Sequence, residues 1–273
     1  LGGARFPNDL VLDLERHRLW VADTGHGRVL ALDAESGAPR LTVDGFLTPR
    51  ALSLAPDGSL WVVDEGTVSG SGALVHLAAD GRELLRRRGF SRPAAVAATS
   101  DGAAVWLVEG GDGGVWLLGS AGDTLLAIED ATRFQRPLVV ESAAGDRSAW
   151  ITDDALEVVV HLAADGSERL RLELGPDRPY GIVLEPGGDA VWIGLNRAGR
   201  IERRLVATGA LQASRGGFDR PLGLERSARD GSIWVADATG ITRLDDAGGE
   251  LTRLDGLLQP YQLSIASPDD APR

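Results

Sequence analysis

The feature that most constrains the fold of this chain is a repeat of about 43 residues. Seven segments open with a proline, two variable residues and an aliphatic residue, and these prolines lie 39 to 44 residues apart: Pro7, Pro49, Pro93, Pro137, Pro179, Pro221 and Pro260. Six of the seven tryptophans follow the same period, 41 to 45 residues apart: Trp20, Trp61, Trp106, Trp150, Trp192 and Trp234. Two independent series with one period indicate a repeat architecture.

Each repeat unit contains four short strand patterns. In the first unit these cover residues 9–13, 19–23, 28–33 and 40–43, and polar or glycine-containing turns separate them. Asp-Gly pairs in later units, such as Asp80 with Gly81, favour tight hairpins. The second strand is apolar on both faces, as in a strand buried between layers, whereas the fourth strand carries charge, as at a solvent-facing edge.

A four-stranded unit of this length is typical of a β-propeller blade, which buries its faces by stacking on neighbouring blades. The sequence therefore predicts an all-β, six-bladed β-propeller of four-stranded blades, with the tryptophans filling the wedges between blades. We expect a single domain over residues 1–273, with six units at about 5–257 and an extra strand or tail at 258–273. The strand pattern at 260–265 leaves two alternatives open, a seven-bladed ring or an incompletely closed ring.

Composition narrows the classes of partner and location. The chain has 28 basic and 40 acidic residues, a formal net charge of −12, which argues against binding to nucleic acid or to an anionic membrane. Cysteine is absent, so disulfides and cysteine-ligated metals are excluded. No apolar run approaches the roughly 20 residues of a membrane span, and no signal segment opens the chain. Methionine is absent even at position 1, which indicates a mature or excised segment; we expect a bacterial periplasmic or extracellular protein.

The units resemble NHL repeats. Residues 9–13, 19–25 and 28–33 carry that family's strand–turn–strand signature almost in full, and residues 221–224 with 233–237 repeat it less completely. The resemblance covers nearly the whole chain and implies a propeller. Similar propellers include protein- and RNA-binding domains, sensors, lactonases and lyases, so the fold does not choose among activities.

Two enzyme families with related propellers define an alternative function. Pro7-Asn8-Asp9-Leu10 is similar to a motif of SMP-30/gluconolactonase-like propellers, in which an Asn helps to hold a divalent metal such as calcium or zinc together with a Glu, a second Asn and an Asp. The residues at the matching positions here supply neither carboxylate nor amide oxygens: Arg50, Ala94, Leu138, Tyr180 and Leu222. Residues 179–182 and 199–201 resemble streptogramin lyases, which implies a metal-assisted elimination with a histidine base late in the chain. The last two units contain no histidine.

The repeat also predicts which face binds ligands. Loops that join the fourth strand to the next unit, and the second strand to the third, emerge on one face, where propellers commonly bind. On this face an arginine precedes the proline in four units: Arg92, Arg136, Arg178 and Arg220. An acid follows the tryptophan by three residues in five units: Asp23, Asp64, Glu109, Asp153 and Asp237. Asp is favoured at turns and Arg pairs with carboxylates, so a structural role is the simplest interpretation of the recurring residues.

Positions that break the repeat are stronger candidates for ligand contact, because scaffold roles recur from unit to unit. We predict no catalytic residues, no cofactor and, apart from Asn8 as a weak candidate, no metal ligand. The predicted function is a non-catalytic recognition or scaffold propeller that binds a peptide or protein, a carbohydrate or a small anionic ligand; the alternative is a metal-dependent lactonase-like hydrolase or a lyase. The ligand-binding candidates are Asn8, Arg50, Tyr180, Asn196, His26, Arg92, Arg136, Arg178 and Arg220. His76 and His161 recur within one string and are expected to pack in the core.

Overall fold

The computed structural model describes residues 3–227 and 229–256, and nearly all of its regular structure is β-strand. The first strand of each blade begins at or near the repeated proline: β1 (Pro7–Asp13), β5 (Pro49–Leu54), β9 (Pro93–Ala98), β13 (Pro137–Ser142), β17 (Pro179–Leu184) and β21 (Gly223–Arg226). The second strand carries the repeated tryptophan: β2 (Arg18–Asp23), β6 (Leu60–Asp64), β10 (Ala104–Glu109), β14 (Ala149–Asp153), β18 (Ala190–Leu195) and β22 (Ile233–Asp237).

The third and fourth strands complete each blade. The third strands are β3 (Arg28–Asp33), β7 (Gly72–Leu77), β11 (Val115–Gly119), β15 (Val158–Leu162), β19 (Arg200–Leu205) and β23 (Gly240–Leu244). The fourth strands are β4 (Pro39–Asp44), β8 (Glu83–Phe90), β12 (Thr124–Ile128), β16 (Glu168–Glu173), β20 (Leu211–Gly216) and β24 (Glu250–Asp255). The described residues also contain two short 3-10 turns, η1 (Thr24–His26) and η2 (Gly175–Asp177).

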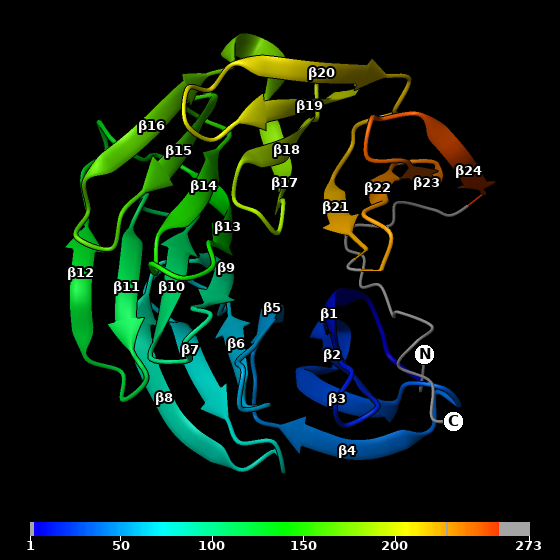
Figure 1. Ribbon diagram of the computed structural model, residues 1–273. Coiled ribbons are helices and arrows are strands. Elements are labelled where there is room, and N and C mark those ends of the chain that lie inside the picture. The colour runs from blue at the N-terminus through cyan, green and yellow to red at the C-terminus, as the bar shows by residue number, and fades with distance from the viewer. Residues whose placement is uncertain (1–2, 228, 257–273) are drawn as a thin grey trace. The chain divides into compact units, whose positions relative to one another are not determined.

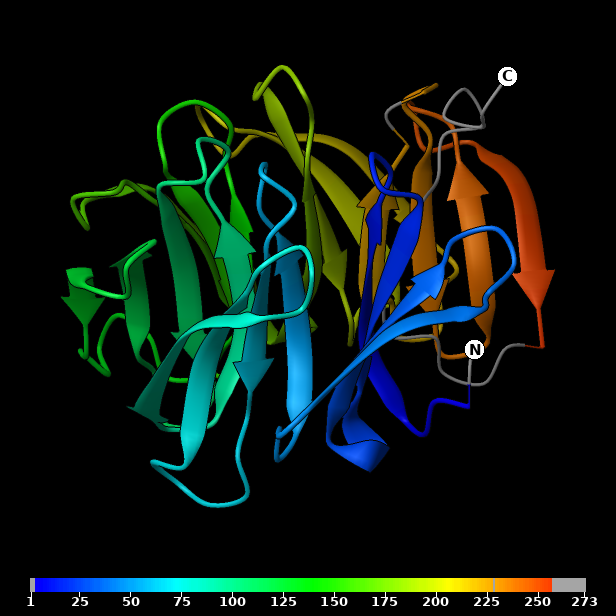
Figure 2. The ribbon, with the colours of Figure 1, turned by 90° about the horizontal axis from the view of Figure 1, so that it is seen from below.

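The strands form six four-stranded sheets, and within each sheet they lie in chain order. Figure 1 shows one such blade as β5 to β8, and Figure 2 shows the blue β1–β4 blade beside it. The predicted fold class, an all-β protein of six four-stranded propeller blades, is confirmed. The second strands are buried and the fourth strands are largely exposed, as the polarity of their sequences predicts.

The chain divides into two compact units: Leu1–Ala149 with Ala163–Gly166, and Trp150–Leu162 with Ser167–Arg273. In the first unit the first strands of successive blades pack against one another, β1 on β5, β5 on β9 and β9 on β13; in the second unit β17 packs on β21. The extra strand predicted at 258–273 lies outside the described residues, and the single domain stays a prediction. Within the described parts of the chain, no helix has the length and apolar character needed to cross a membrane.

The repeated tryptophans fill the space between consecutive blades. Trp20 of β2 is buried against Leu52 and Val62 of the next blade, and Trp61 of β6 is buried against Val105 in the same way. The predicted wedge role is therefore confirmed for these residues. Truncating a buried aromatic side chain of this kind costs about 3–5 kcal/mol of folding free energy.

The two histidines that recur in the repeat have packing roles, as predicted. The His76 ring stacks on Trp61 with centroids 3.9 Å apart, and the His161 ring stacks on Trp150 at 4.6 Å. Nε2 of His76 lies 2.8 Å from the Ser59 hydroxyl oxygen. Burial lowers the pKa of His76, so the neutral ring is favoured in the core.

Candidate functional site

The repeated acid at the end of each second strand holds the loop that enters the same blade. Asp64 is buried, and its carboxylate accepts hydrogen bonds from the backbone N–H groups of Leu47 at 2.9 Å and Thr48 at 2.6 Å. The equivalent backbone donors in other blades are Arg5 to Asp23, Ser91 to Glu109 and Asp219 to Asp237. These acids satisfy loop N–H groups, which is the structural role that turn chemistry predicts.

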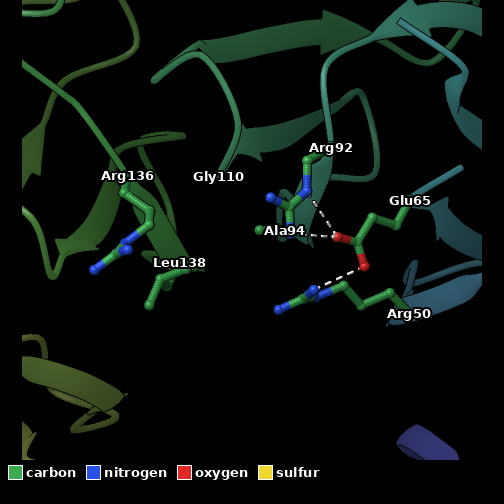
Figure 3. Close-up of a pocket in the computed structure, with 7 residues that line it drawn as sticks. All are labelled: Arg50, Glu65, Arg92, Ala94, Gly110, Arg136 and Leu138. Carbon is green, nitrogen blue, oxygen red and sulfur yellow. Dashed lines mark hydrogen bonds and ion pairs between the residues drawn. The ribbon is translucent and has the colours of Figure 1, made fainter. Parts of the chain in front are cut away.

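Glu65 directly follows this structural acid and has different partners, because successive side chains of an extended segment point to opposite sides. Its Oε2 accepts a hydrogen bond from Nη1 of Arg50 at 2.8 Å. Its Oε1 accepts from Nε and Nη2 of Arg92, both at 3.3 Å, as Figure 3 shows. The Glu65 side chain is 15% exposed, that of Arg50 28% and that of Arg92 63%. A mostly buried carboxylate therefore orients two guanidinium groups, one of them open to solvent.

These residues line a cavity of about 140 Å³ in the first unit, together with Ala94, Gly110, Arg136 and Leu138. In Figure 3, Arg136 and Leu138 enter from one side, Arg50 and Glu65 from the other, and Ala94 lies between them. All seven residues lie at or near the start of a first strand or the end of a second strand, the face that the repeat predicts for binding. We call this cavity the channel-mouth pocket.

The charge of the channel-mouth pocket differs in sign from that of the whole chain. Three arginines and one glutamate give its lining a formal charge of +2, whereas the chain has a formal net charge of −12. A concave site whose lining has a net charge of one sign favours ions of the opposite sign. The pocket therefore has a cationic lining on an acidic protein.

The backbone also fixes the direction of Arg92. Its φ is +53°, in the left-handed region, and Arg178 and Arg220 adopt nearly the same value before their own prolines. This conformation costs an L-residue about 1–2 kcal/mol. The carbonyl of Arg92 accepts a hydrogen bond from the Gly110 N–H at 3.1 Å, which holds the loop in place. The side chain of Arg92 thus leaves a constrained backbone toward the pocket.

Three of the nine predicted ligand-binding residues line the channel-mouth pocket: Arg50, Arg92 and Arg136. Six predicted residues are not among those that line it: Asn8, His26, Arg178, Tyr180, Asn196 and Arg220. Nδ1 of His26 lies 3.0 Å from the structural acid Asp23. The side chain of Asn196 donates to the Pro221 carbonyl at 3.4 Å, and the Tyr180 carbonyl accepts from the Thr152 hydroxyl at 3.2 Å. The ligand-binding roles of all six stay predictions.

Glu65 is the pocket residue that sequence reasoning missed. The two adjacent acids Asp64 and Glu65 have different partners. The sequence pattern alone does not indicate that Glu65 pairs with one arginine of its own blade and one arginine of the next blade. The available signal is that a second acid follows the repeated one in the unit where Arg50 breaks the series.

The residues around Asn8 do not fit the metal site that the SMP-30 resemblance implies. Among the described residues there is no group of three or more His, Asp or Glu side chains able to hold a metal ion. The neighbouring Asp9 accepts hydrogen bonds from the backbone N–H groups of Leu52 at 2.7 Å and Leu10 at 2.8 Å. Burial raises the pKa of Asp9 to about 7, against the opposing effect of these two hydrogen bonds. Both hydrogen bonds to Asp9 come from backbone groups, which is a structural role like that of Asp64.

No family model and no curated protein matches this chain. It is similar to the solved structure of a streptogramin B lyase, with a TM-score of 0.78 and 16% identity over 95% of this chain and 87% of that one. It is also similar to a Kuenenia stuttgartiensis hydrazine synthase, with a TM-score of 0.77 and 14% identity over 98% and 91%. A third similar structure is a catalytically inactive histidine-to-alanine variant of virginiamycin B lyase from Staphylococcus aureus with quinupristin, with a TM-score of 0.75 and 13% identity over 93% and 84%.

At these identities the likeness shows the fold alone. Fold and site together define a six-bladed β-propeller with a cationic pocket on its strand-start face. The finer resemblance to NHL or SMP-30 propellers stays a prediction.

Proposed function

We propose that this protein is a non-catalytic recognition propeller that binds a small anionic ligand in the channel-mouth pocket. The observation that carries this proposal is the convergence of three arginines and a single carboxylate on one small cavity of an acidic chain. A guanidinium group presents five N–H donors in a planar fork that matches carboxylate and phosphate oxygens. The sequence also predicts peptides and carbohydrates as ligand classes. Among the three classes, the positive charge of the pocket lining favours a small anion.

The ion pairs within the pocket leave donors for a ligand. Arg50 uses only Nη1 in its hydrogen bond to Glu65, and its Nε and Nη2 donate to no other described residue. The guanidinium group of Arg92 reaches Glu65 while most of the side chain stays exposed. An anion can therefore bind without displacing Glu65, and the arginines are already ordered before it arrives, which lowers the entropic cost of binding.

The enzymatic alternative receives less support from the residues present. The similar virginiamycin B lyase variant, which is catalytically inactive, carries an alanine in place of a histidine. In this chain the four histidines are His17, His26, His76 and His161, and none lines the channel-mouth pocket. Two of them stack on core tryptophans, and His26 pairs with a structural acid. No histidine is thus placed to transfer a proton in the pocket.

Isothermal titration with succinate and inorganic phosphate, and with glucose as the neutral probe, tests this proposal. We expect the anions to bind, with affinity that falls as salt screens the pocket. Arg50→Gln is expected to weaken anion binding about tenfold, because a charge-assisted hydrogen bond contributes about 1.5 kcal/mol or more. Glu65→Gln is expected to tighten it about threefold to tenfold, because it removes a negative charge a few ångströms away.

Two outcomes would overturn the proposal. The first is anion binding that neither Arg50→Gln nor Glu65→Gln changes. The second is a rise in melting temperature with calcium or zinc, together with lactone hydrolysis, both lost in Asn8→Ala; a ligand that binds only the native state stabilises it in this way. The second outcome would assign the protein to the metal-dependent hydrolases.

A further inference from the structure

The channel-mouth pocket has two cationic ends separated by an apolar floor. Arg50 and Arg92, held by Glu65, form one end, and Arg136 forms the other. Ala94 and Leu138 lie between the two ends (Figure 3). This layout differs from that of a site for a single compact anion, in which all donors point at one centre.

We infer that the ligand is a short aliphatic dicarboxylate that spans the pocket, an inference that rests on the proposed anion-binding function. One carboxylate accepts hydrogen bonds from the free N–H groups of Arg50 and Arg92, and the other contacts Arg136. The intervening methylene groups lie on Ala94 and Leu138, where burial of apolar surface contributes to binding. The two negative charges of such a ligand match the formal charge of +2 on the lining.

The size of the pocket limits the length of the ligand. A cavity of about 140 Å³ is well below the 300 Å³ or more of sites for drug-sized molecules. A cavity of this size suits a four- or five-carbon diacid better than a longer chain. Inorganic phosphate has its charge at one centre and cannot reach both ends. A monocarboxylate has a single charged group and contacts only one end.

Two sources supply this chemistry, a free diacid and the C-terminal aspartate of a peptide, because that residue contains a succinate skeleton. Both present two carboxylates separated by two carbons. Titration of succinate alongside the peptide Gly-Gly-Asp separates the sources. Tighter binding of the peptide assigns the dicarboxylate to a chain end, and tighter binding of succinate assigns it to the free acid.

The test is a titration series with malonate, succinate, glutarate, adipate, butyrate and inorganic phosphate. We expect succinate or glutarate to bind at least tenfold more tightly than butyrate or phosphate, with a maximum within the diacid series. Arg136→Gln should weaken succinate about tenfold and change butyrate less than twofold, because it removes only the second end of the site. Arg40→Gln is the matched control: Arg40 of β4 pairs with Asp33 of β3 outside the pocket, and its loss should change succinate affinity less than twofold.

The outcomes separate this inference from the proposed function. If phosphate and butyrate bind as tightly as succinate and Arg50→Gln weakens all three, anion binding stands and the dicarboxylate is wrong. The inference is also wrong if Arg136→Gln weakens butyrate as much as succinate. If none of the anions binds to the wild-type protein, both the inference and the proposed function fall.

Discussion

The ends of β6 and β22 are built alike but lead to different surroundings. Asp64 and Asp237 occupy the same repeat position, both are buried, and both accept backbone N–H groups of the entering loop. The next residue is Glu65 after β6 and Ala238 after β22. A carboxylate at the position after the repeated acid can form ion pairs with arginines, and the methyl group of an alanine cannot.

The arginines that precede the prolines differ in what the preceding blade offers them at this position, Glu65 for Arg92 and Asn196 for Arg220. Arg92 and Arg220 have the same backbone conformation, with φ of +53° and +55°. Arg92 pairs with Glu65 and lines the channel-mouth pocket, whereas Arg220 is 57% exposed and pairs with the preceding Asp219. The comparison indicates that the repeated acid serves the architecture, and that the residue after it in the preceding blade, Glu65 for Arg92 and Asn196 for Arg220, decides whether the arginine has a carboxylate partner there.

The largest expected effect is a difference in stability loss between variants of the two adjacent acids, Asp64 and Glu65. Asp64→Ala leaves the loop N–H groups of Leu47 and Thr48 without their buried acceptor, so the free energy of unfolding should fall by about 3 kcal/mol. Glu65→Ala removes ion pairs whose arginine partners stay accessible to water, and should cost about 1 kcal/mol or less. Urea unfolding of both variants measures the difference, and equal losses would contradict the division of roles.

The next effect separates the two arginines. Arg92→Gln should weaken succinate binding about tenfold, because it removes a donor from the pocket. Arg220→Gln makes the same change on the same backbone, but its partner is a surface acid, so we expect less than a twofold change. Isothermal titration at one ionic strength measures both. An equal loss in the two variants would show that the residue after the repeated acid does not select the site.

The smallest expected effect concerns pH and compares Glu109 of β10 with Asp237 of β22, which share the repeat position. Burial raises the pKa of Glu109 above its ordinary 4.5, although hydrogen bonds from the Ser91 N–H and the Trp116 indole oppose it. At Asp237 burial also acts to raise the pKa, but hydrogen bonds from Thr239 and the charge of Arg253 outweigh it, and the pKa falls below 3.8.

The two shifts have opposite consequences for stability. Folded Glu109 binds its proton more tightly than the unfolded chain does, so its contribution to stability is present below pH 4.5 and is lost as pH rises through the raised pKa. Asp237 contributes stability above pH 3.8 and loses it as pH falls through the lowered pKa. Measuring the free energy of unfolding across pH tests both shifts. Glu109→Gln should remove the part of the stability loss that occurs as pH rises, and Asp237→Asn should remove the part that occurs as pH falls. A change on the same side in both variants would contradict these assignments.

Much of the architecture follows from the sequence because the residues that build it recur. Pro49 and Trp61 mark the strands of one blade, and the same marks predict the other five. The repeat also predicts that Arg50, Arg92 and Arg136 lie on one face. The repeat could not show that they meet at one cavity, because side-chain partners depend on neighbouring loops.

Arg92 and Arg220 illustrate the limit. Each arginine directly precedes the repeated proline of its unit, so the repeat predicts the same role for both. The difference arises from their partners: Arg92 pairs with Glu65 of the preceding blade, whereas Arg220 pairs with the adjacent Asp219. Glu65 was missed for a related reason, since its pairing with Arg92 joins residues 27 positions apart.

The most direct measurement is a crystal structure of the protein grown with succinate at a concentration that saturates the titration. The account predicts one carboxylate at hydrogen-bonding distance from Arg50 and Arg92, the other at Arg136, and the carbon chain on Ala94 and Leu138. Succinate bound at any other place, with the channel-mouth pocket holding only solvent, would contradict it.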